Sequence, residues 1–280
     1  MSIKMAALTP HPPLIIPDIG GSDIKRVQDT VDSLREISGE IVSKDPDVLV
    51  TISPHGQVFR DGVSILDFDS VYGDFGDFGA PGVSFQEEID HELTSYIIEE
   101  AEDKEFDIIS LSASSGLRSG LSGRKSRQGE LDHGVMVPLY YLKEAGLKAP
   151  LVPLNMGFLS YNKLYELGYM IQQVLAEKGY EAVVLASGDL SHRLKKGAPA
   201  GYNPRGAEFD QLLMELLGDE KYAEILEIDQ DLIEDAGECG LRPLVILLGI
   251  IKDLNFHSDV KSYEGPFGVG YGVVGFYGEE

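Results

Sequence analysis

The feature that most constrains the fold is a regular alternation of short β-branched runs with segments of helical periodicity. Strands are expected at Ile3–Leu8, Asp47–Ser53, Asp107–Ser112, Ala149–Asn155 and Glu181–Ser187. Helical patterns are expected between them, at Ser22–Ser43, Phe85–Glu100, Gly134–Ala145 and Tyr161–Lys178. This alternation is typical of crossover units built around a parallel sheet. We therefore expect one α/β domain over residues 1–280, with a largely parallel central sheet flanked by helices.

The last third of the chain departs from this alternation. From Arg205 to about Leu254 the pattern is almost entirely helical, and the chain then ends in a glycine-spaced run, GPFGVGYGVVGFYG. We expect that run to form a closing strand at a sheet edge, because glycine-rich strands are weakly specified. The glycine- and serine-rich segment Ser115–Gly129 predicts a surface loop, or alternatively a substrate lid. Its basic residues could attract a carboxylated aromatic: Arg118, Arg124, Lys125 and Arg127.

Charge and cysteine content exclude several classes of partner. The chain has 23 Lys+Arg against 47 Asp+Glu, a formal net charge of −24, which repels nucleic acid and anionic membranes. No stretch reaches the roughly 18 uninterrupted apolar residues of a membrane span, and the N-terminus does not read as a signal peptide. The single cysteine, Cys239, allows no intramolecular disulfide. We expect a cytoplasmic protein.

Three of the six histidines directly follow expected strands. They are His11 in TPHPP, His55 in ISPHG and His192 in SGDLSH. In open α/β sheets the ligand crevice lies beyond the carboxyl ends of the strands, so these side chains should meet there.

A late carboxylate completes a candidate metal site. Glu238 precedes a strongly apolar helical run, so it is expected to be partly buried and to need a partner, either a metal ion or the positive end of that helix. His11, His55 and Glu238 together would form the two-histidine, one-carboxylate arrangement of non-haem Fe(II) sites that use dioxygen. His192 would take a proton from a phenol. Asp189 would orient His192 or, as the favoured reading, cap the following turn.

Five motifs in this order resemble those of the class III extradiol ring-cleavage dioxygenases, the LigB superfamily. They are PHPP, SPHG, LDHGVMVPL, SGDLSHRL and ECGLRPL, and the similarity runs from residue 4 to about residue 277. The chain is most similar to the dioxygenase-like domain called AmmeMemoRadiSam system protein A, which is related to the Memo proteins. The resemblance implies a LigB-like fold and O₂-dependent ring opening of a catecholic aromatic.

The resemblance also implies roles for particular residues. His11, His55 and Glu238 match the ligands of an Fe(II) ion, and His192 matches the acid/base histidine. His133 matches a second active-site histidine. From the residues alone, His133 is equally well read as a neighbour of the helix cap Asp132.

Cys239 is a departure that opens a second interpretation. It begins the run CGLRP, and in Memo-like relatives a cysteine in a similar context binds the metal. With Cys239 as ligand the softer site would suit Zn or Cu, and the chain would be a Memo-like metal-binding protein without ring-cleaving activity. A free cysteine is otherwise a small buried residue. Arg242 would pair with Glu238 or with a substrate carboxylate. The resemblance further implies a homo-oligomer and pathway partners of the AMMECR1 or radical-SAM type.

Overall fold

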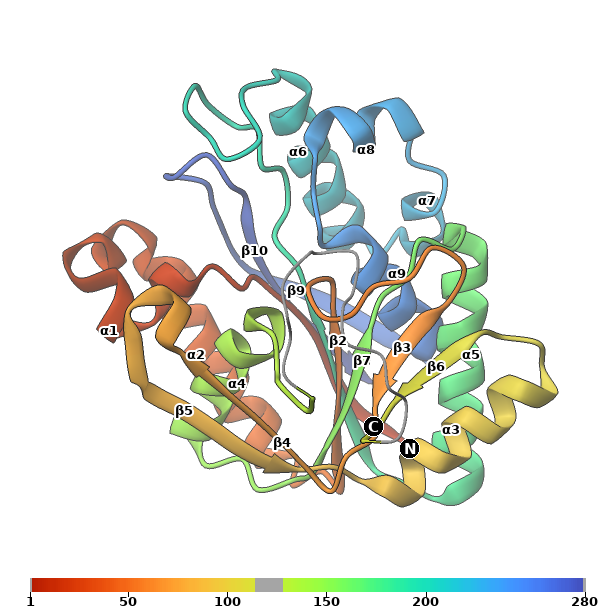
Figure 1. The fold of residues 1–280 in the computed structure, drawn as a ribbon. Coiled ribbons are helices and arrows are strands. Elements are labelled where there is room, and N and C mark those ends of the chain that lie inside the picture. Colours follow the sequence, from red (N-terminus) through yellow and green to blue (C-terminus); the bar gives the residue numbers. More distant parts are fainter. Residues whose placement is uncertain (1, 114–127, 279–280) are drawn as a thin grey trace.

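The computed structural model describes residues 2–113 and 128–278 (Figure 1). The strands are β1 (Ile3–Thr9), β2 (Val48–Ser53), β3 (Val63–Leu66), β4 (Ser70–Phe75), β5 (Ala80–Glu88), β6 (Ile108–Leu111), β7 (Leu151–Asn155), β8 (Ala182–Ser187), β9 (Phe256–Glu264) and β10 (Tyr271–Gly278). The helices are α1 (Pro17–Gly20), α2 (Gln28–Ser43), α3 (His91–Asp103), α4 (His133–Ala145), α5 (Tyr161–Lys178), α6 (Arg205–Gly218), α7 (Tyr222–Ile225), α8 (Gln230–Ala236) and α9 (Leu241–Ile250).

Most of the described strands join one eight-stranded sheet in the order β6-β3-β7-β2-β8-β1-β10-β9. The four central strands β7, β2, β8 and β1 run parallel, whereas β3 is antiparallel to β7 and β10 is antiparallel to β1. The remaining two strands, β4 and β5, form a separate antiparallel hairpin. The expected α/β fold with a largely parallel sheet is therefore confirmed.

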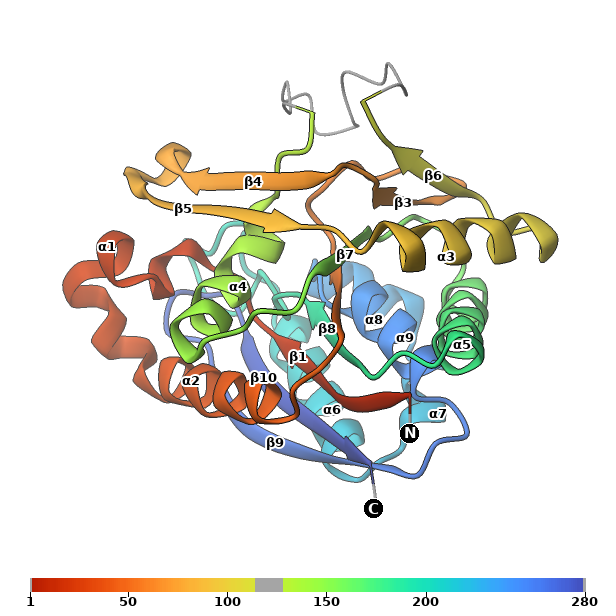
Figure 2. The same cartoon turned by 90° about the horizontal axis from the view of Figure 1, so that it is seen from below.

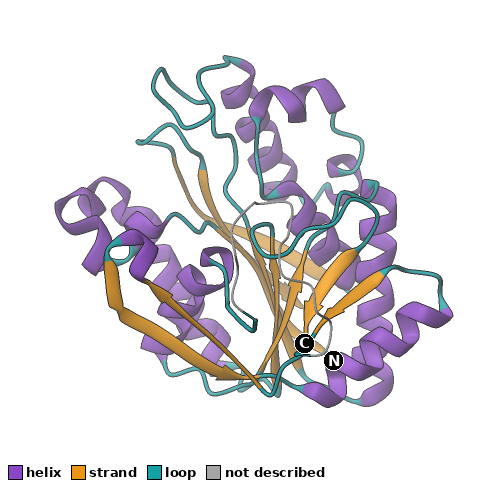
Figure 3. Ribbon diagram, in the orientation of Figure 1, coloured by secondary structure: helices purple, strands orange, loops and turns teal. Residues whose placement is uncertain are grey.

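Helices cover both faces of the sheet, as the ribbon views show (Figures 2 and 3). One apolar layer packs α2 and α4 on the sheet, and the other packs α5 and α9. Successive residues of the central strands serve alternate layers: in β8, Val184 belongs to one core and Val183 and Leu185 to the other. A strand buried on both faces reads as a continuous apolar run, which explains why the central strands were predictable from the sequence. Among the described residues, no helix combines the length and apolar character needed to cross a bilayer.

Two sequence expectations were wrong. The helix expected at Phe85–Glu100 begins only at His91, because Phe85 to Glu88 continue strand β5, where exposed and half-buried residues alternate against β4. The C-terminal run does form a strand, β10, but it lies inside the sheet between β1 and β9. The edge position is taken by β9, whose polar sequence FHSDVKSYE gave no strand signal. The segment Ser115–Gly129, with its basic residues, lies outside the described residues except for its last two positions.

The chain enters and leaves the sheet at the same end. β1 and β10 are antiparallel neighbours, with Met5 opposite Tyr277. Figure 1 places the N and C labels side by side in the lower half of the picture.

Candidate metal centre

Three side chains from distant parts of the chain converge beyond the carboxyl ends of the parallel strands. The ligand atoms of His11, His55 and Cys239 all lie within 4.8 Å of one another. Nε2 of His11 is 2.8 Å from Nε2 of His55 and 3.6 Å from Sγ of Cys239. This is the group of potential metal ligands that the described part of the chain brings together.

The sheet brings the two histidines into contact. His11 lies two residues after β1, and His55 lies two residues after β2. Strand β8 separates β1 from β2 in the sheet and runs parallel to both, so the three strands end at the same edge. The convergence predicted from the sequence for His11 and His55 thus follows from the parallel topology.

Cys239 reaches the site because two glycines allow a close backbone approach. A Cβ atom on Gly188 would lie 2.1 Å from Cα of Gly240, so no residue larger than glycine fits at position 188 without moving the backbone. At this crossing the backbone N–H of Cys239 donates to the carbonyl of Asp189 over 3.2 Å. The N–H of Asp189 in turn donates to Sγ of Cys239 over 3.3 Å.

Asp189 fixes the loop that carries His11. Its Oδ1 atom accepts the backbone N–H of His11 at 2.9 Å. The side chain of Asp189 therefore does not cap the following turn, as expected from the sequence, but joins the loop after β8 to the loop after β1. Burial raises the pKa of Asp189 to about 7, and the hydrogen bond from the His11 backbone opposes that rise.

Burial keeps the imidazoles neutral, the form that binds metal ions. It lowers the pKa of His11 well below its ordinary value, with further lowering from the nearby His55, His133 and His192. Burial also lowers the pKa of His55 to about 4, with His133 the next cause. Burial, and then the carboxyls of Asp189 and Glu238, raises the pKa of the Cys239 thiol well above its ordinary value.

The structure does not bring Glu238 into the group of converging ligands. Its Oε2 atom accepts the backbone N–H of Leu241 at 2.6 Å, in the first turn of α9. The helix-terminus role is thus the one that the structure displays. Burial raises the pKa of Glu238 to about 7, while the bond from Leu241 and the charge of Arg242 lower it. Arg242 itself donates to the carbonyl of Leu159 at 2.5 Å and lies 4.8 Å from the ring centroid of Tyr161.

The two other predicted histidines lie around the same centre. Nε2 of His192 is 3.7 Å from Sγ of Cys239. The ring of His133 stacks on that of His55 with centroids 4.3 Å apart, and its centroid lies 5.6 Å from that of Phe78 in an edge-on arrangement. Asp132 caps α4 beside it by accepting the N–H of Gly134 at 2.8 Å. The helix-cap reading and the proximity of His133 to the site therefore both hold.

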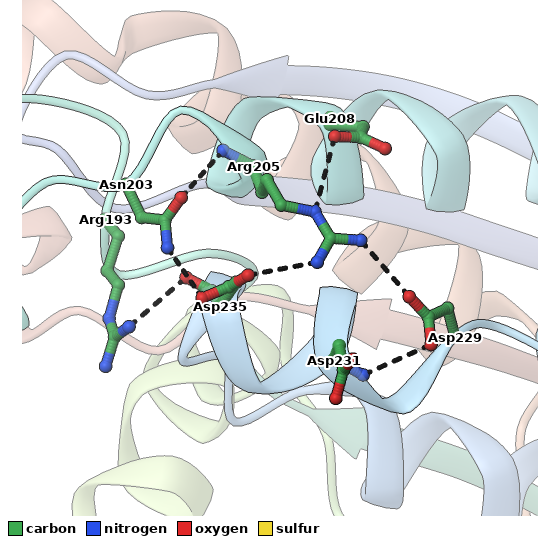
Figure 4. A network of polar contacts seen from close by, with 7 residues as sticks. All are labelled: Arg193, Asn203, Arg205, Glu208, Asp229, Asp231 and Asp235. Atoms are coloured by element: carbon green, nitrogen blue, oxygen red, sulfur yellow. Dashed lines mark hydrogen bonds and ion pairs between the residues drawn. The ribbon is translucent and has the colours of Figure 1, made fainter.

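The loop that carries His192 is held by a polar network between α6 and α8 (Figure 4). Asp235 of α8 accepts from Asn203 at 2.7 Å and pairs with Arg205 at 3.0 Å. Arg193, the neighbour of His192, donates to the backbone carbonyl of Asp235 at 3.4 Å. Arg205 also reaches Asp229 at 3.2 Å, which ties the two ends of α8 to the start of α6. The backbone of His192 is tied to α8 as well, because its N–H donates to the carbonyl of Ala236 at 3.2 Å.

The distances within the converging group suit a single metal ion. Metal–nitrogen bonds are about 2.0–2.1 Å and metal–thiolate bonds about 2.3 Å. The 2.8 Å between the two Nε2 atoms is shorter than two metal–nitrogen bonds, and the 3.6 Å to Sγ is shorter than one bond of each kind. Each of these two pairs is therefore close enough to share one ion, and all three ligand atoms lie within 4.8 Å of one another. Cys239, which the sequence offered as the alternative ligand, is the side chain that joins the two histidines, whereas Glu238 is not part of this group.

Comparisons with known proteins cover nearly the whole chain. The family described as the catalytic LigB subunit of aromatic ring-opening dioxygenase matches residues 5–274. A protein of Clostridium acetobutylicum is 38% identical over 274 residues, which make up 98% of this chain and 57% of that protein. This chain therefore spans a little over half the length of that relative.

More distant relatives carry two different descriptions. A 2,3-dihydroxyphenylpropionate/2,3-dihydroxicinnamic acid 1,2-dioxygenase of Azotobacter vinelandii is 25% identical over 218 residues, 75% of this chain and 63% of that enzyme. A MEMO1 family protein of Methanocaldococcus jannaschii is 29% identical over 135 residues, 44% of this chain and 41% of that protein. The crystal structure of an uncharacterized Escherichia coli K12 protein shares the fold, with a TM-score of 0.58 at 14% identity, over 98% of this chain and 100% of that one.

Proposed function

This chain belongs to the LigB family, and on that premise we propose that it is a metal-dependent redox protein whose ion is held by His11, His55 and Cys239. The observation that carries the proposal is the position of the Cys239 thiol. Sγ stands 3.6 Å from Nε2 of His11, whereas the carboxylate of Glu238 is engaged with the first turn of α9. The ligand set is thus two imidazoles and a thiolate.

A thiolate changes which ion the site prefers. Soft sulfur ligands select Cu(I) and zinc, whereas a carboxylate in the same place suits Fe(II). Of the two ions that sulfur ligands favour, copper can change its redox state and zinc cannot, and redox chemistry agrees with a family whose description names an aromatic ring-opening dioxygenase. When bound, the ion would supply one-electron redox chemistry toward O₂.

The surrounding residues would control protons and water at this centre. His192 approaches Sγ of Cys239 to 3.7 Å, close enough to accept the thiol proton when Cys239 becomes a ligand. The ring of His133, stacked on His55 and in edge contact with Phe78, would limit the access of water to His55. Burial makes each of these electrostatic contacts stronger than it would be in water.

Exchange of the two candidate ligands tests the proposal. The experiment compares three metal-free proteins, namely wild type, Cys239→Ser and Glu238→Gln. Each is titrated under anaerobic conditions with Cu(I), Zn(II) or Fe(II) in the presence of a competing chelator. We expect Cys239→Ser to weaken Cu(I) binding by about 100-fold or more, because a ligand should cost at least as much as its supporting residues. Glu238→Gln retains an acceptor for the Leu241 N–H, so its affinity should stay within about threefold of wild type. The opposite ranking would replace Cys239 by Glu238 in the ligand set.

A second candidate function is O₂-dependent extradiol opening of a catecholic ring at an Fe(II) ion. The observation that favours it is the presence of His192 and His133 at the centre, together with the distant relative described as a dioxygenase. His192 would take the proton of a substrate hydroxyl. Iron-loaded protein incubated with a panel of catechols under O₂ should then form yellow ring-opened products. Tight binding of iron without any product across the panel would exclude this activity.

A further inference from the structure

Ser187 occupies an unusual position between the metal centre and helix α4. It is the last residue of β8 and is fully buried. Its Oγ atom lies 2.5 Å from the backbone carbonyl oxygen of Gly134 and 2.8 Å from Nδ1 of His11. A hydroxyl has one proton and two lone pairs, so Ser187 can donate to only one of these partners.

The carbonyl of Gly134 requires that proton. In a regular helix it would accept from the N–H four residues later, but that residue is Pro138, which has no N–H. If Ser187 donated elsewhere, its lone pairs would face those of the carbonyl oxygen at 2.5 Å with no hydrogen between them. The hydroxyl of Ser187 therefore donates to Gly134, and the proton on the other contact must come from His11.

This assignment fixes the tautomer of His11. Nδ1 carries the proton and donates it to Ser187, so Nε2 keeps its lone pair. In the metal-free protein this lone pair accepts a hydrogen bond from Nε2 of His55 at 2.8 Å, and Sγ of Cys239 lies 3.6 Å from the same atom. A histidine that binds a metal through one ring nitrogen is commonly oriented by a hydrogen bond that its other ring nitrogen donates. In this chain the acceptor is Ser187, whose own proton is already donated to the carbonyl of Gly134.

We propose that Ser187, committed to the Gly134 carbonyl by the absence of an N–H at Pro138, is the positioning residue that holds the His11 proton on Nδ1 and presents Nε2 to the metal. Pro138 leaves the carbonyl of Gly134 in α4 without a helical donor, Ser187 at the end of β8 donates to that carbonyl, and Ser187 therefore accepts from His11. The tautomer follows from contacts in the protein alone, and only its purpose rests on the proposed function. A serine that merely fills the core would leave the tautomer of His11 unconstrained.

Nitrogen-15 NMR of the histidine rings in metal-free protein tests this directly, with His11 identified by the signals lost in His11→Gln. We expect wild-type His11 to be protonated on Nδ1 and bare on Nε2. Ser187→Ala removes the acceptor, so a mixture of tautomers should appear and Cu(I) affinity should fall about 10- to 100-fold.

Pro138→Ala provides a second variant that should fold well, because alanine favours helix. It restores an N–H for the Gly134 carbonyl and frees the Ser187 proton for His11 Nδ1, so the Nε2-protonated form should increase. Ser64→Ala is the matched control, since Ser64 is equally buried and donates to the carbonyl of Gln57 at 2.6 Å. Its His11 signals should match wild type.

The proposal is overturned if wild-type His11 carries its proton on Nε2, or if both Ser187→Ala and Pro138→Ala keep the wild-type tautomer. The expected tautomers combined with no metal binding in wild type would instead remove the proposed function, while the role of Ser187 would stand.

Discussion

Sγ of Cys239 lies 3.6 Å from Nε2 of His11, although 228 positions of sequence separate the two residues. The first strand loop and the approach to α9 therefore meet only when the whole sheet is assembled. An ion bound at this point would contact the folded state and not the unfolded chain, so its binding free energy adds to the free energy of unfolding.

Metal addition should accordingly stabilise the fold. At a free Cu(I) concentration 1,000 times the Kd, the free energy of unfolding should rise by about 4 kcal/mol. The rise would be measured by thermal unfolding under reducing, anaerobic conditions with buffered Cu(I). Cu(I) should raise the unfolding temperature of Cys239→Ser far less than that of wild type. An equal rise in that variant would speak against the thiol as a ligand.

Replacement of His192 should separate metal binding from chemistry. His192 is near the thiol but outside the converging ligand group, so His192→Ala should bind Cu(I) within about threefold of wild type. Loss of a proton-transferring group typically costs about 10²- to 10⁴-fold in rate. Oxygen consumption by the metal-loaded proteins would measure the second effect and chelator competition the first. A variant that fails to bind metal would show that His192 is needed for binding, either as a ligand or as the acceptor of the Cys239 proton.

The crossing of Gly188 and Gly240 should be intolerant of a single methyl group. In Gly188→Ala the new Cβ would meet Cα of Gly240 at 2.1 Å, so α9 must move and carry Cys239 with it. We expect a loss of roughly 1–3 kcal/mol in the free energy of unfolding, the usual cost of overpacking, together with weaker Cu(I) binding. Urea unfolding and metal titration would measure the two losses. Wild-type values for both would mean that the crossing does not position the thiol.

Gly39 offers the matched control. It lies within α2, and a Cβ there would meet nothing within 4 Å. Gly39→Ala should therefore raise the free energy of unfolding by about 0.5–1 kcal/mol, because alanine is the better helix former, and should leave metal affinity unchanged. Urea unfolding followed by circular dichroism would show the gain. Destabilisation instead would reveal a packing constraint on α2 that the structure does not display.

Asp210 should make stability depend on pH. It is buried in α6, where it accepts from the Ser191 N–H and from the Tyr263 hydroxyl, each at 2.7 Å. Burial raises its pKa from 3.8 to about 6, although both hydrogen bonds oppose the shift. Between these values the folded state holds a proton that the unfolded chain has released. The free energy of unfolding should therefore fall as pH rises from about 4 to about 6, by up to roughly 3 kcal/mol, and then level off.

Asp210→Asn isolates this contribution. The amide keeps an acceptor for Ser191 and stays neutral, so the variant should gain stability relative to wild type as pH rises through that window. Denaturant unfolding of both metal-free proteins at half-unit pH intervals would give the difference curve. A flat difference between pH 4 and 7 would show that Asp210 does not hold its proton in the folded protein.

The sequence was most informative where burial on both faces leaves a continuous apolar signal. The run VLVTIS in β2 and the run AVVLAS in β8 are of this kind, and the histidines behind such strands were found for the same reason. The hairpin β4–β5 and the edge strand β9 were missed, because their residues alternate in exposure and include many polar side chains. Pairing with a neighbouring strand, rather than local preference, decides such segments.

The ligand set shows a similar division. Position after a parallel strand is a topological property, so His11 and His55 could be placed from the order of the elements. The choice between Glu238 and Cys239 depends on which of these two adjacent side chains points toward the histidines. That orientation is set by the contact between Gly188 and Gly240, which are 52 positions apart in the sequence. No local pattern carries that information.

The antiparallel pairing of Met5 with Tyr277 has a practical consequence for work with this protein. The start of β1 and the end of β10 lie at the end of the sheet opposite the carboxyl ends of the parallel strands, where the three ligands converge. An affinity tag or a fused reporter placed before β1 or after β10 would therefore begin at the end of the sheet far from His55. A short peptide joining these two ends, with a new opening in a surface loop, should likewise yield a circularly permuted chain that still assembles the centre.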